Sequence, residues 1–442
     1  MSRTASLGRK SRGCAAFPLV FMFVGTPAYA QSALCPTSFG SQTGIVFQGS
    51  TCTNGVTGAY SNAALASESL SQLTQSSTQD TTKATMSAVS ERRAAEAQRS
   101  MSASRFAPEA PDPALASMPA ALMAFAPTNP ILTKAPAVEA PHWAFWTQGY
   151  GEYEQFNGQS AGLGEFSTLA LNVKSTTWSG GALGGSDVTF RNLAYGGDGL
   201  ILGLLGGYEA ARASLNVASI SSDPSTPTGF STMTANLSGP VTGAYASYFN
   251  GGFSTDVAFK VEFYDMSLSF ADLLGFKSAP GFSPTSVPFS GSGSTRLDVY
   301  TASGNVNYRI PIAWNFWVEP TAGFAYSISN FASGADQLGL ADGSVLRLQG
   351  GDRVGFDGVW NGMRVTTVLT GLLYDDVLVT GGVLANAANP LIVADQGKLR
   401  AEGILAFNLY QGNGVSYLVL GDIQGGEGLF AVGGKAGVRV AW

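Results

Sequence analysis

Leu429 to Trp442 read LFAVGGKAGVRVAW, and this C-terminal stretch decides the fold. Its apolar and small residues occupy one set of alternate positions: Phe430, Val432, Gly434, Ala436, Val438, Val440 and Trp442. The other set contains both of its charges: Gly433, Lys435, Gly437, Arg439 and Ala441. Because successive side chains of a β-strand point to opposite faces, the pattern indicates a strand with one apolar and one polar environment.

The same period of two returns along the chain from Trp143 onward. Residues 256–264 alternate in this way, and residues 399–410 do so less regularly because Ile404 falls on the polar side. The alternation predicts about twelve strands. They lie near residues 143–155, 176–194, 200–217, 232–249, 253–269, 295–310, 314–330, 344–358, 363–381, 398–411, 415–424 and 429–442.

The connections between these strands alternate in length. Every second one is tight and mostly contains the Gly and Asn that turns require: 196–199, 250–252, 311–313, 360–362 and 412–414. The intervening connections are longer, except the last at 425–427: 156–175, 218–230, 271–294, 331–343 and 382–397. Bacterial barrels with an even strand number have short periplasmic turns and long outer loops. Residues 142–442 are therefore predicted to form an all-β, antiparallel transmembrane β-barrel.

Composition distinguishes a membrane barrel from a soluble one. A β-sandwich or lipocalin-like barrel also alternates, but its outer surface is rich in charge. Only 12% of this chain is charged, 11% is aromatic and Gly occurs 56 times, whereas a globular domain is about one quarter charged. The apolar residues also form no block of the roughly 20 residues that a membrane helix needs. Part of the aromatic residues should form interfacial girdles, and others can pack against the lumen content. The relevant residues are Trp143, Trp146, Tyr150, Tyr153, Trp314, Phe316 and Trp317.

Residues 1–30 are predicted to be a cleavable secretory signal. Its basic residues are Arg3, Arg9, Lys10 and Arg12. An apolar run follows at 14–24, and small residues at Ala28 and Ala30 place the cleavage between Ala30 and Gln31. The apolar run is shorter than the roughly 20 residues of a membrane span, which argues against a retained anchor. The signal implies the Sec export pathway.

Residues 31–141 are predicted to be a low-complexity, partly helical segment. Cys35 and Cys52 are the cysteines left after cleavage, and a disulfide between them is expected in an exported chain. Residues 62–99 permit a helix but contain too few apolar side chains to bury a core alone. The Ala/Pro-rich stretch 107–141 suits an extended linker, with at most a short helix at 114–126.

The sequence offers few candidate catalytic residues. The formal charge is −6, and an acidic chain gives no reason to expect a nucleic-acid partner. The one histidine, His142, precedes the first strand and is predicted to be an interfacial residue rather than a base. Asp375 and Asp376 are adjacent on a strand and so point to opposite faces. We predict no enzyme activity, no cofactor and no metal.

Three stretches resemble the β-domain of autotransporters, the type V secretion proteins. HWAFWTQGYG at 142–151 resembles its opening strand, which commonly starts with a Trp, a polar residue and a Gly-aromatic pair. GLLGGY at 203–208 resembles the third strand, and 425–442, with its GGEG turn and terminal aromatic residue, resembles the closing strands. The resemblance covers about 143–442.

The resemblance implies that the passenger threads through the lumen and that a helix stays inside as a plug. Such a lumen must be polar, and the alternation points seven charged residues inward: Glu152, Lys260, Glu262, Arg309, Arg400, Lys435 and Arg439. For any one of them, solvation of a water-filled lumen is an equal alternative to holding a helix. Either 62–99 or 114–126 is a candidate plug, and we favour the second because it is nearer the barrel.

The last strand also resembles the signal that the barrel-assembly machinery reads. Val438, Val440 and Trp442 place an apolar face on a strand edge that can add to another sheet, and Trp442 is expected to be a girdle residue as well. The departure from the family is the passenger. Only about 110 residues precede the barrel, and they lack the repeated pattern of a β-helix.

The expected function is that of an outer-membrane translocator barrel of a Gram-negative bacterium, carrying or displaying its own short N-terminal passenger. The segment would lie at the cell surface or in the lumen, and the barrel is expected to be monomeric. Its expected partners are outer-membrane lipid, the barrel-assembly machinery and the Sec pathway. A passive channel or structural barrel with a periplasmic N-terminal segment, or a surface adhesin, are the alternatives.

Overall fold

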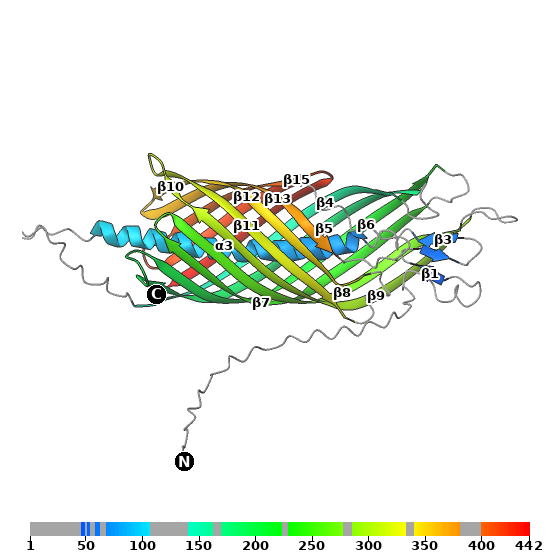
Figure 1. Cartoon of the computed structure of the whole chain (residues 1–442), viewed down its shortest axis with the longest axis horizontal. Coiled ribbons are helices and arrows are strands. Elements are labelled where there is room, and N and C mark those ends of the chain that lie inside the picture. The colour runs from blue at the N-terminus through cyan, green and yellow to red at the C-terminus, as the bar shows by residue number, and fades with distance from the viewer. Residues whose placement is uncertain are drawn as a thin grey trace, which may run out of the picture. The chain divides into compact units, whose positions relative to one another are not determined.

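Strands β4 and β16 pair with each other, and this pairing closes an antiparallel barrel of 12 strands (Figure 1). The computed structural model describes residues 46–48, 51–53, 58–61, 68–106, 140–161, 169–222, 229–276, 285–332, 340–380 and 399–442. All of them belong to one unit, Gln31–Trp442. The barrel strands are β4 (His142–Ala161), β5 (Leu169–Arg191), β6 (Gly199–Ser221), β7 (Phe230–Asn250), β8 (Phe253–Phe276), β9 (Thr285–Tyr308), β11 (Phe316–Phe331), β12 (Gly343–Trp360), β13 (Met363–Thr380), β14 (Arg400–Tyr410), β15 (Val415–Gly426) and β16 (Leu429–Ala441).

Each barrel strand pairs with its neighbours in sequence, apart from the closing pair. The short β10 (Ile310–Pro311) lies between β9 and β11 in the chain and pairs with β11. At the closing seam the backbones of Trp143 and Trp442 exchange hydrogen bonds of 3.1 and 3.0 Å. This closure satisfies the backbone groups of the first and last strands, which no lipid could satisfy. The prediction of an all-β barrel of about twelve strands is confirmed.

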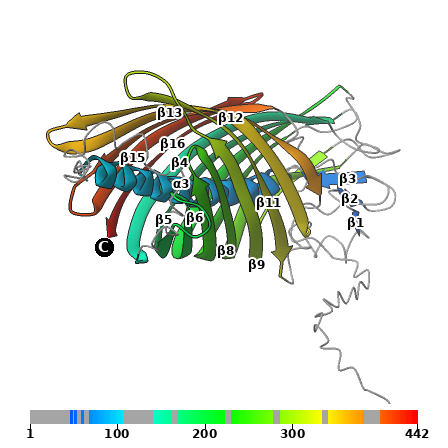
Figure 2. The same cartoon turned by 60° about the vertical axis from the view of Figure 1, so that its left-hand side comes forward.

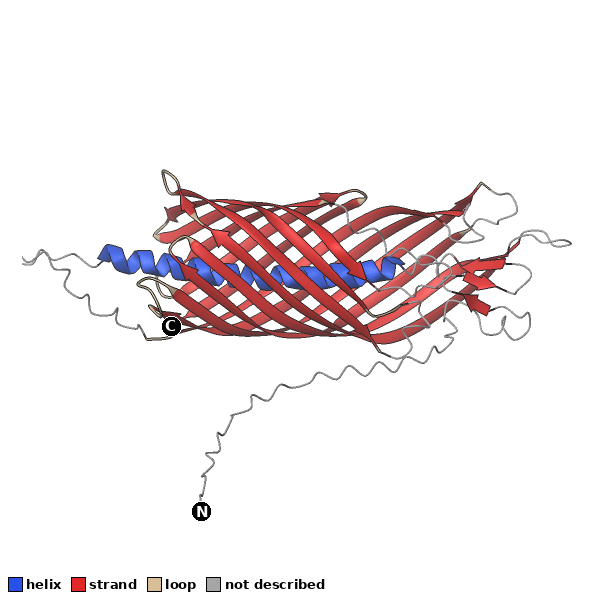
Figure 3. Cartoon of the chain, in the orientation of Figure 1, coloured by secondary structure: helices blue, strands red, loops and turns tan. Residues whose placement is uncertain are grey.

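The tight connections gather at one end of the barrel, which we call the turn end, together with the start of β4 and the end of β16. Positive φ angles occur at Gly251, Asn361, Gly362 and Gly414, so the predicted Gly and Asn residues do provide the turn conformations. The opposite end, which we call the loop end, carries the longer connections and the two-residue turn at 427–428. The strand directions are visible in Figures 2 and 3.

The strands on one side of the barrel continue further toward the loop end than the sequence pattern indicated. The predicted long loop at 271–294 is wrong in part, because β8 continues to Phe276 and β9 begins at Thr285. The predicted second strand, 176–194, likewise begins at Leu169 and ends at Arg191. The described outward residues of the added parts of β5 and β9 include Asn172, Ser292 and Ser294, so the apolar signal that we used to find strands is absent there.

Toward the turn end the barrel is apolar outside and polar inside. On β6 the outward residues Leu202, Leu204 and Tyr208 are 43%, 66% and 54% exposed. On β8, Val257, Phe259 and Phe263 form the same outward row, while Asp256, Lys260 and Glu262 are buried. This reverses the arrangement of a soluble protein and is the surface of a transmembrane β-barrel.

Toward the loop end the same strands reverse their polarity. Leu215 of β6, Met233 of β7 and Phe270 of β8 point inward and join a buried apolar cluster with Leu73 and Leu340. Their outward neighbours are polar, as with Ser214, Asn216 and Asn236. The reversal places the outer edge of the apolar band near Tyr208 and Arg212, where the outer surface changes from facing lipid to facing water.

Helix α3 (Glu68–Phe106) runs lengthwise inside the barrel (Figures 1 and 3). It contains no Gly or Pro, and it ends two residues before Pro108. No helix among the described residues is long and apolar enough to cross a membrane. Before it, the three short strands β1 (Val46–Gln48), β2 (Thr51–Thr53) and β3 (Gly58–Ser61) extend the sheet at the loop end, where β3 pairs with Leu274–Phe276 of β8.

Candidate functional site: the helix-filled lumen

The lumen is occupied by α3, which lies against the wall formed by β5 to β9. Its sequence is a weak helix former because it has many Ser and Thr residues, which compete for backbone hydrogen bonds. Inside the barrel these hydroxyls are used: those of Thr81 and Thr82 donate to the carbonyls of Ser77 and Thr78, at 3.1 and 2.7 Å. These bonds lie within the helix and satisfy two hydroxyl groups that are buried in the lumen.

An apolar seam joins the middle of the helix to the wall. Ala84, Ala88 and Val89 pack in one buried cluster with Trp146 of β4 and Tyr245 of β7. Small helix residues allow these large rings to lie close to the helix axis. The Trp146 indole N–H donates to the Tyr245 hydroxyl at 2.8 Å, so the polar atom of the buried indole is satisfied.

Below the seam, toward the turn end, Arg92 forms the centre of a buried ion network. Its guanidinium is fully buried and pairs with Glu96, one turn along the helix, and with Asp187 of β5. Glu96 also receives hydrogen bonds from Arg191 at 3.0 Å and from Arg439 at 3.4 Å. A buried guanidinium is tolerated only where carboxylates surround it, so the helix and the wall each supply part of one network.

Arg93 forms a second network on the neighbouring face of the helix. Its guanidinium lies 3.1 Å from Asp256 of β8 and 3.2 Å from Glu319 of β11. Arg353 of β12 donates to the same Glu319 at 3.1 Å and to the Ser90 hydroxyl at 2.9 Å. These contacts connect the helix to β8, β11 and β12.

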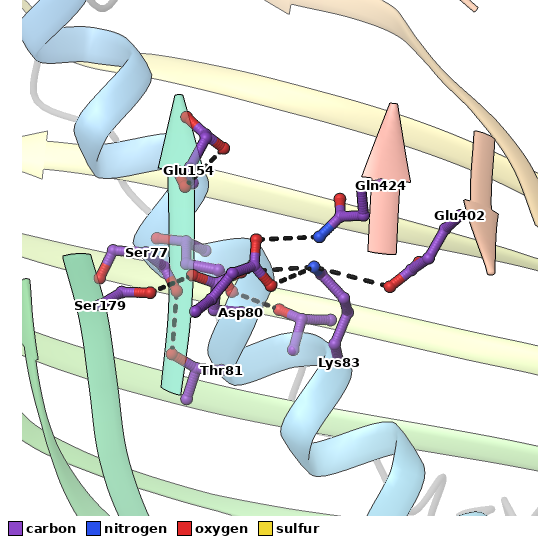
Figure 4. A network of polar contacts seen from close by, with 12 residues as sticks. Ser77, Asp80, Thr81, Lys83, Glu154, Ser179, Glu402 and Gln424 are labelled. Atoms are coloured by element: carbon purple, nitrogen blue, oxygen red, sulfur yellow. Dashed lines mark hydrogen bonds and ion pairs between the residues drawn. The ribbon is translucent and has the colours of Figure 1, made fainter. Parts of the chain in front are cut away.

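Higher in the lumen, Lys83 connects the helix to the closing strands (Figure 4). Its ammonium lies 2.9 Å from Glu152 of β4, 3.4 Å from Asp80 and 3.7 Å from Glu402 of β14. Asp80 accepts a hydrogen bond from Ser179 of β5 at 2.5 Å. One lysine is thus shared by three carboxylates, and the excess negative charge is partly neutralised by hydroxyl donors.

Hydroxyl groups hold the helix where β6 and β8 face it. The carboxylate of Glu209 accepts hydrogen bonds from Ser77 at 2.7 Å, from Thr81, and from Tyr264 at 2.7 Å. On β8 the Lys260 ammonium donates to the Thr78 carbonyl at 2.9 Å and pairs with Glu262. These contacts explain why the helix is rich in Ser and Thr, because such side chains reach carboxylates without adding charge.

A cavity of about 210 Å³ remains between α3 and the wall, lined by residues of β8, β9 and β11–β16. Its charged lining comes from both the helix and the wall: Lys83, Glu91, Arg93, Arg309, Glu319, Arg347, Arg353, Glu402, Asp422 and Lys435. Ile404, the residue that broke the alternation, also lines it. A cavity of this size holds several water molecules but no folded segment.

The structure brings the seven predicted lumen residues to the inner wall in different roles. Glu152, Lys260 and Arg439 contact the helix directly, and Glu262 pairs with Lys260. Arg309 pairs with Asp357 and lies 4.0 Å from the Trp317 ring centroid, so it supports the wall rather than the helix. Lys435 lines the large cavity, and Arg400 lines a smaller one near Glu154.

The preference for 114–126 as the plug is wrong for the described lumen, because the helix there is Glu68–Phe106. Distance along the chain did not decide the occupant; complementary charge did, and 114–126 contains no Lys, Arg, Asp or Glu. Residues 114–126 themselves lie outside the described residues, as do Ala30, Gln31 and Cys35. Cys52 lies in β2.

The predicted aromatic residues divide between the two faces. Trp143, Phe316 and Trp314 point outward, whereas Trp146, Tyr150 and Trp317 are buried toward the lumen. Tyr153 packs on Trp178 with ring centroids 4.6 Å apart. Val438, Val440 and Trp442 lie on the outer face of β16, which is paired on both sides in the closed barrel.

The sequence reasoning missed the charged residues that anchor the helix. Arg92, Arg93 and Glu96 stand in a stretch that was expected to be a weak helix, and their partners Asp187 and Glu319 were not singled out. A signal did exist. The partners Asp187 and Glu319 occupy inward positions of the alternation, and Arg92 and Glu96 of the helix have opposite charges four residues apart.

In the described part of the chain, no group of three or more His, Cys, Asp or Glu residues is arranged to hold a metal ion. His142 begins β4 at the turn end. Many of the charged residues of the lumen belong to networks in which the helix and the wall each supply a partner, as with Lys83, Arg92 and Arg93. Their arrangement therefore serves to bind a helix within a closed wall.

No protein-family model and no curated protein sequence matches the chain. Among solved structures, it is similar to the β domain of the Bordetella autotransporter BrkA, with 15% identity, 67% of this chain and 98% of that chain covered, and a TM-score of 0.42. It is similar to the transport unit of the autotransporter AIDA-I from Escherichia coli, with 14% identity, coverage of 70% and 93%, and a TM-score of 0.42. A FadL homologue from Pseudomonas aeruginosa matches with 10% identity, coverage of 68% and 90%, and a TM-score of 0.31.

Proposed function

We propose that this chain is an outer-membrane translocator barrel of a Gram-negative bacterium that displays its own short N-terminal segment. The observation that carries the proposal is the threaded helix. The strands before α3 pair with β8 at the loop end, whereas the chain after α3 enters β4 at the turn end. A chain that passes through its own closed barrel in this direction is the arrangement that transport of its N-terminal segment across a membrane would leave, and this supports the proposal.

The orientation in the membrane follows from the turns. Bacterial barrels with an even strand number keep their termini and short turns in the periplasm. The loop end then faces the outside, and with it the residues before Glu68. The ion networks of Arg92 and Arg93 hold the helix in the lumen after transport, so the N-terminal segment stays attached to the cell.

The test is the accessibility of the segment on intact cells. A protease-cleavable tag at residue 55 is expected to be removed by protease added outside. A tag in the 361–362 turn serves as the matched control and is expected to be protected until the outer membrane is opened. Full protection of the residue 55 tag, in cells where a tag in the 223–228 loop is cleaved, would reject surface display.

A passive channel is the second candidate, and the cavity beside the helix is the observation that favours it. This cavity is bounded by α3, so a channel function requires that ions pass a helix that is tied to the wall by several buried ion pairs. Steady conductance of the intact chain in planar bilayers would support the channel. We expect only rare and small openings.

A further inference from the structure

A cationic surface lies on the outside of the barrel, directly above the apolar band on β5 and β6. Its charged members are Lys174 and Arg212, which both point outward and are exposed. Neither makes an ion pair or a side-chain hydrogen bond with any residue that the structure describes. This differs from the lumen, where Arg92 and Arg93 of the helix are matched with carboxylates.

The register shows how this surface is built. Arg212 pairs directly with Trp178 of β5 on one side and with Asn236 of β7 on the other. Two positions toward the loop end, the row consists of hydroxyl residues: Thr176, Ser214 and Thr234. Two further positions along, Lys174 pairs with Asn216, which pairs with Thr232. Rows of hydroxyl, amide and cationic groups thus follow one another on a single outward face.

Carboxylates are absent from the outward positions of this surface in the described parts of β4 to β7. The acidic residues of those strands, Glu152, Glu154, Asp187 and Glu209, all contribute to the lumen side. The first outward carboxylate is Asp265 on β8, and it is directly opposite Arg296 of β9. The outer surface of β5 and β6 therefore carries two cations, Lys174 and Arg212, that have no carboxylate beside them among the described residues, whereas Arg296 on β9 lies opposite Asp265.

The height of this surface selects its ligand. Trp178 is 62% exposed and packs against Tyr153 with the rings tilted, and Tyr208 lies nearer the turn end than Arg212 on the same face of β6. Such aromatic rings mark the level of lipid headgroups. Arg212 lies in the same row as Trp178 and two outward positions above Tyr208, at the level of the phosphates of the outer leaflet, and Arg suits phosphate because it can donate two parallel hydrogen bonds.

We propose that Lys174 and Arg212, with Trp178 and the hydroxyl rows between them, form a binding site for a phosphorylated glycolipid headgroup of the outer leaflet. The two cations are roughly 14 Å apart at their Cα atoms, from about 3.3 Å per residue and about 4.8 Å between strands. A headgroup with one phosphate at each end of a disaccharide suits two separated cations, and the acyl chains would lie on the apolar band below. The site rests on the loop end facing outward, as in the proposed function.

The test uses the purified full chain in neutral detergent micelles. Binding of bisphosphorylated lipid A is followed by the change in tryptophan fluorescence and by native mass spectrometry. The Lys174→Gln/Arg212→Gln double variant is expected to bind roughly tenfold or more weakly, since each surface cation adds about one kcal/mol toward anionic lipid. Lipid A without its phosphates should bind the native chain as weakly as the bisphosphorylated form binds the double variant.

Arg296→Gln is the matched control, because it removes an outward cation of the same barrel face that already lies opposite Asp265. Its affinity is expected to stay within about twofold of the native chain. Equal affinity of the double variant and the native chain, or competition by millimolar inorganic phosphate alone, would overturn the proposal. Binding in micelles does not depend on how the barrel is oriented in a membrane. The display test and the binding test can therefore fail separately, and each failure can be recognised. Heat-modifiable mobility on gels establishes that each variant is folded.

Discussion

Single residues in the lumen are stabilised by charges that only the other side of the helix–wall contact can match. Arg92 is 0% exposed, and without its carboxylate partners its burial would be unfavourable by several kcal/mol. The same holds in reverse for Asp187, which would be left with the Tyr245 hydroxyl at 2.9 Å as its side-chain donor. The pair therefore contributes less to total stability than to fixing where along the barrel the helix stops.

Replacement of Arg92 by Ala should destabilise the protein by about 3–5 kcal/mol, because Asp187 and Glu96 lose their shared partner in a buried place. Urea unfolding in micelles, followed by the fluorescence of the lumenal Trp146, measures the change. Ser87→Ala is the control on the same helix, since the Ser87 hydroxyl donates only to the Ala84 carbonyl. An unchanged midpoint for Arg92→Ala would contradict the network.

Asp352 is an anomaly on the outer surface. It is exposed on β12 between Val354 and Leu348, within the apolar band, and its cross-strand neighbours are Pro320 and Gly371. A carboxylate facing lipid costs free energy that increases with depth. Asp352→Leu is therefore expected to stabilise the barrel by about 1–2 kcal/mol. The urea midpoint in lipid vesicles should increase, while Asp342→Leu, in the loop-end connection, should not raise it.

At the scale of elements, the connection 192–198 between β5 and β6 is longer than a two-residue hairpin turn, and a side chain holds it in shape. The Asp198 carboxylate accepts hydrogen bonds from the backbone N–H groups of Leu193, Ala194 and Tyr195, at 2.7, 3.0 and 3.1 Å. Asn192 accepts one from Gly197 at 2.9 Å. The expectation of a tight turn at 196–199 identified its glycines but not the carboxylate that holds it.

The pH dependence of this turn can be derived from Asp198. Burial raises the pKa of its carboxyl, but the backbone donors outweigh this effect and lower the pKa below its ordinary value. A lowered folded-state pKa means that the stabilisation is complete above the unfolded pKa of about 4 and is lost as pH falls through the folded value.

Asp198→Ala should therefore be less stable than the native chain at pH 7, and the difference should shrink below about pH 4. Unfolding midpoints measured at steps between pH 3 and pH 7 test this. A difference that stays constant over the whole range would show that the charge of Asp198 has no role in the turn.

At the scale of the whole molecule, the closed wall and the helix form one unit that is shut by its own chain. The wall satisfies its backbone by closure, and the helix satisfies the charges that the wall points inward. A cavity of about 210 Å³ remains beside the helix, and a smaller one lies near Glu154.

Deletion of residues 68–106 should open the pore and raise single-channel conductance in planar bilayers at least severalfold, because the barrel then loses its occupant. Deletion of residues 31–61 alone is the control and should leave conductance low, since α3 and its contacts stay in place. Equal conductance of both deletions would show that α3 does not close the barrel.

The strand pattern could be predicted from sequence because lipid and water impose it locally. All twelve predicted segments are strands, and Lys260 and Arg439 point inward as the alternation requires. The beginning of β9 could not be predicted, because beyond the band its outward residues are as polar as a loop, as with Ser292 and Ser294. The positions of the turns followed from Gly and Asn, whose conformations depend on neighbours in sequence only.

The sequence by itself determined the barrel: its strands, their polarity and the end at which the tight turns lie, since each of these depends on contacts with solvent or lipid at a single residue. Only the tertiary structure decided which segment fills the lumen. Arg92 meets Asp187 and Arg93 meets Asp256 across 95 and 163 residues of chain. Such partners become neighbours only after β4 and β16 have closed the wall around the helix.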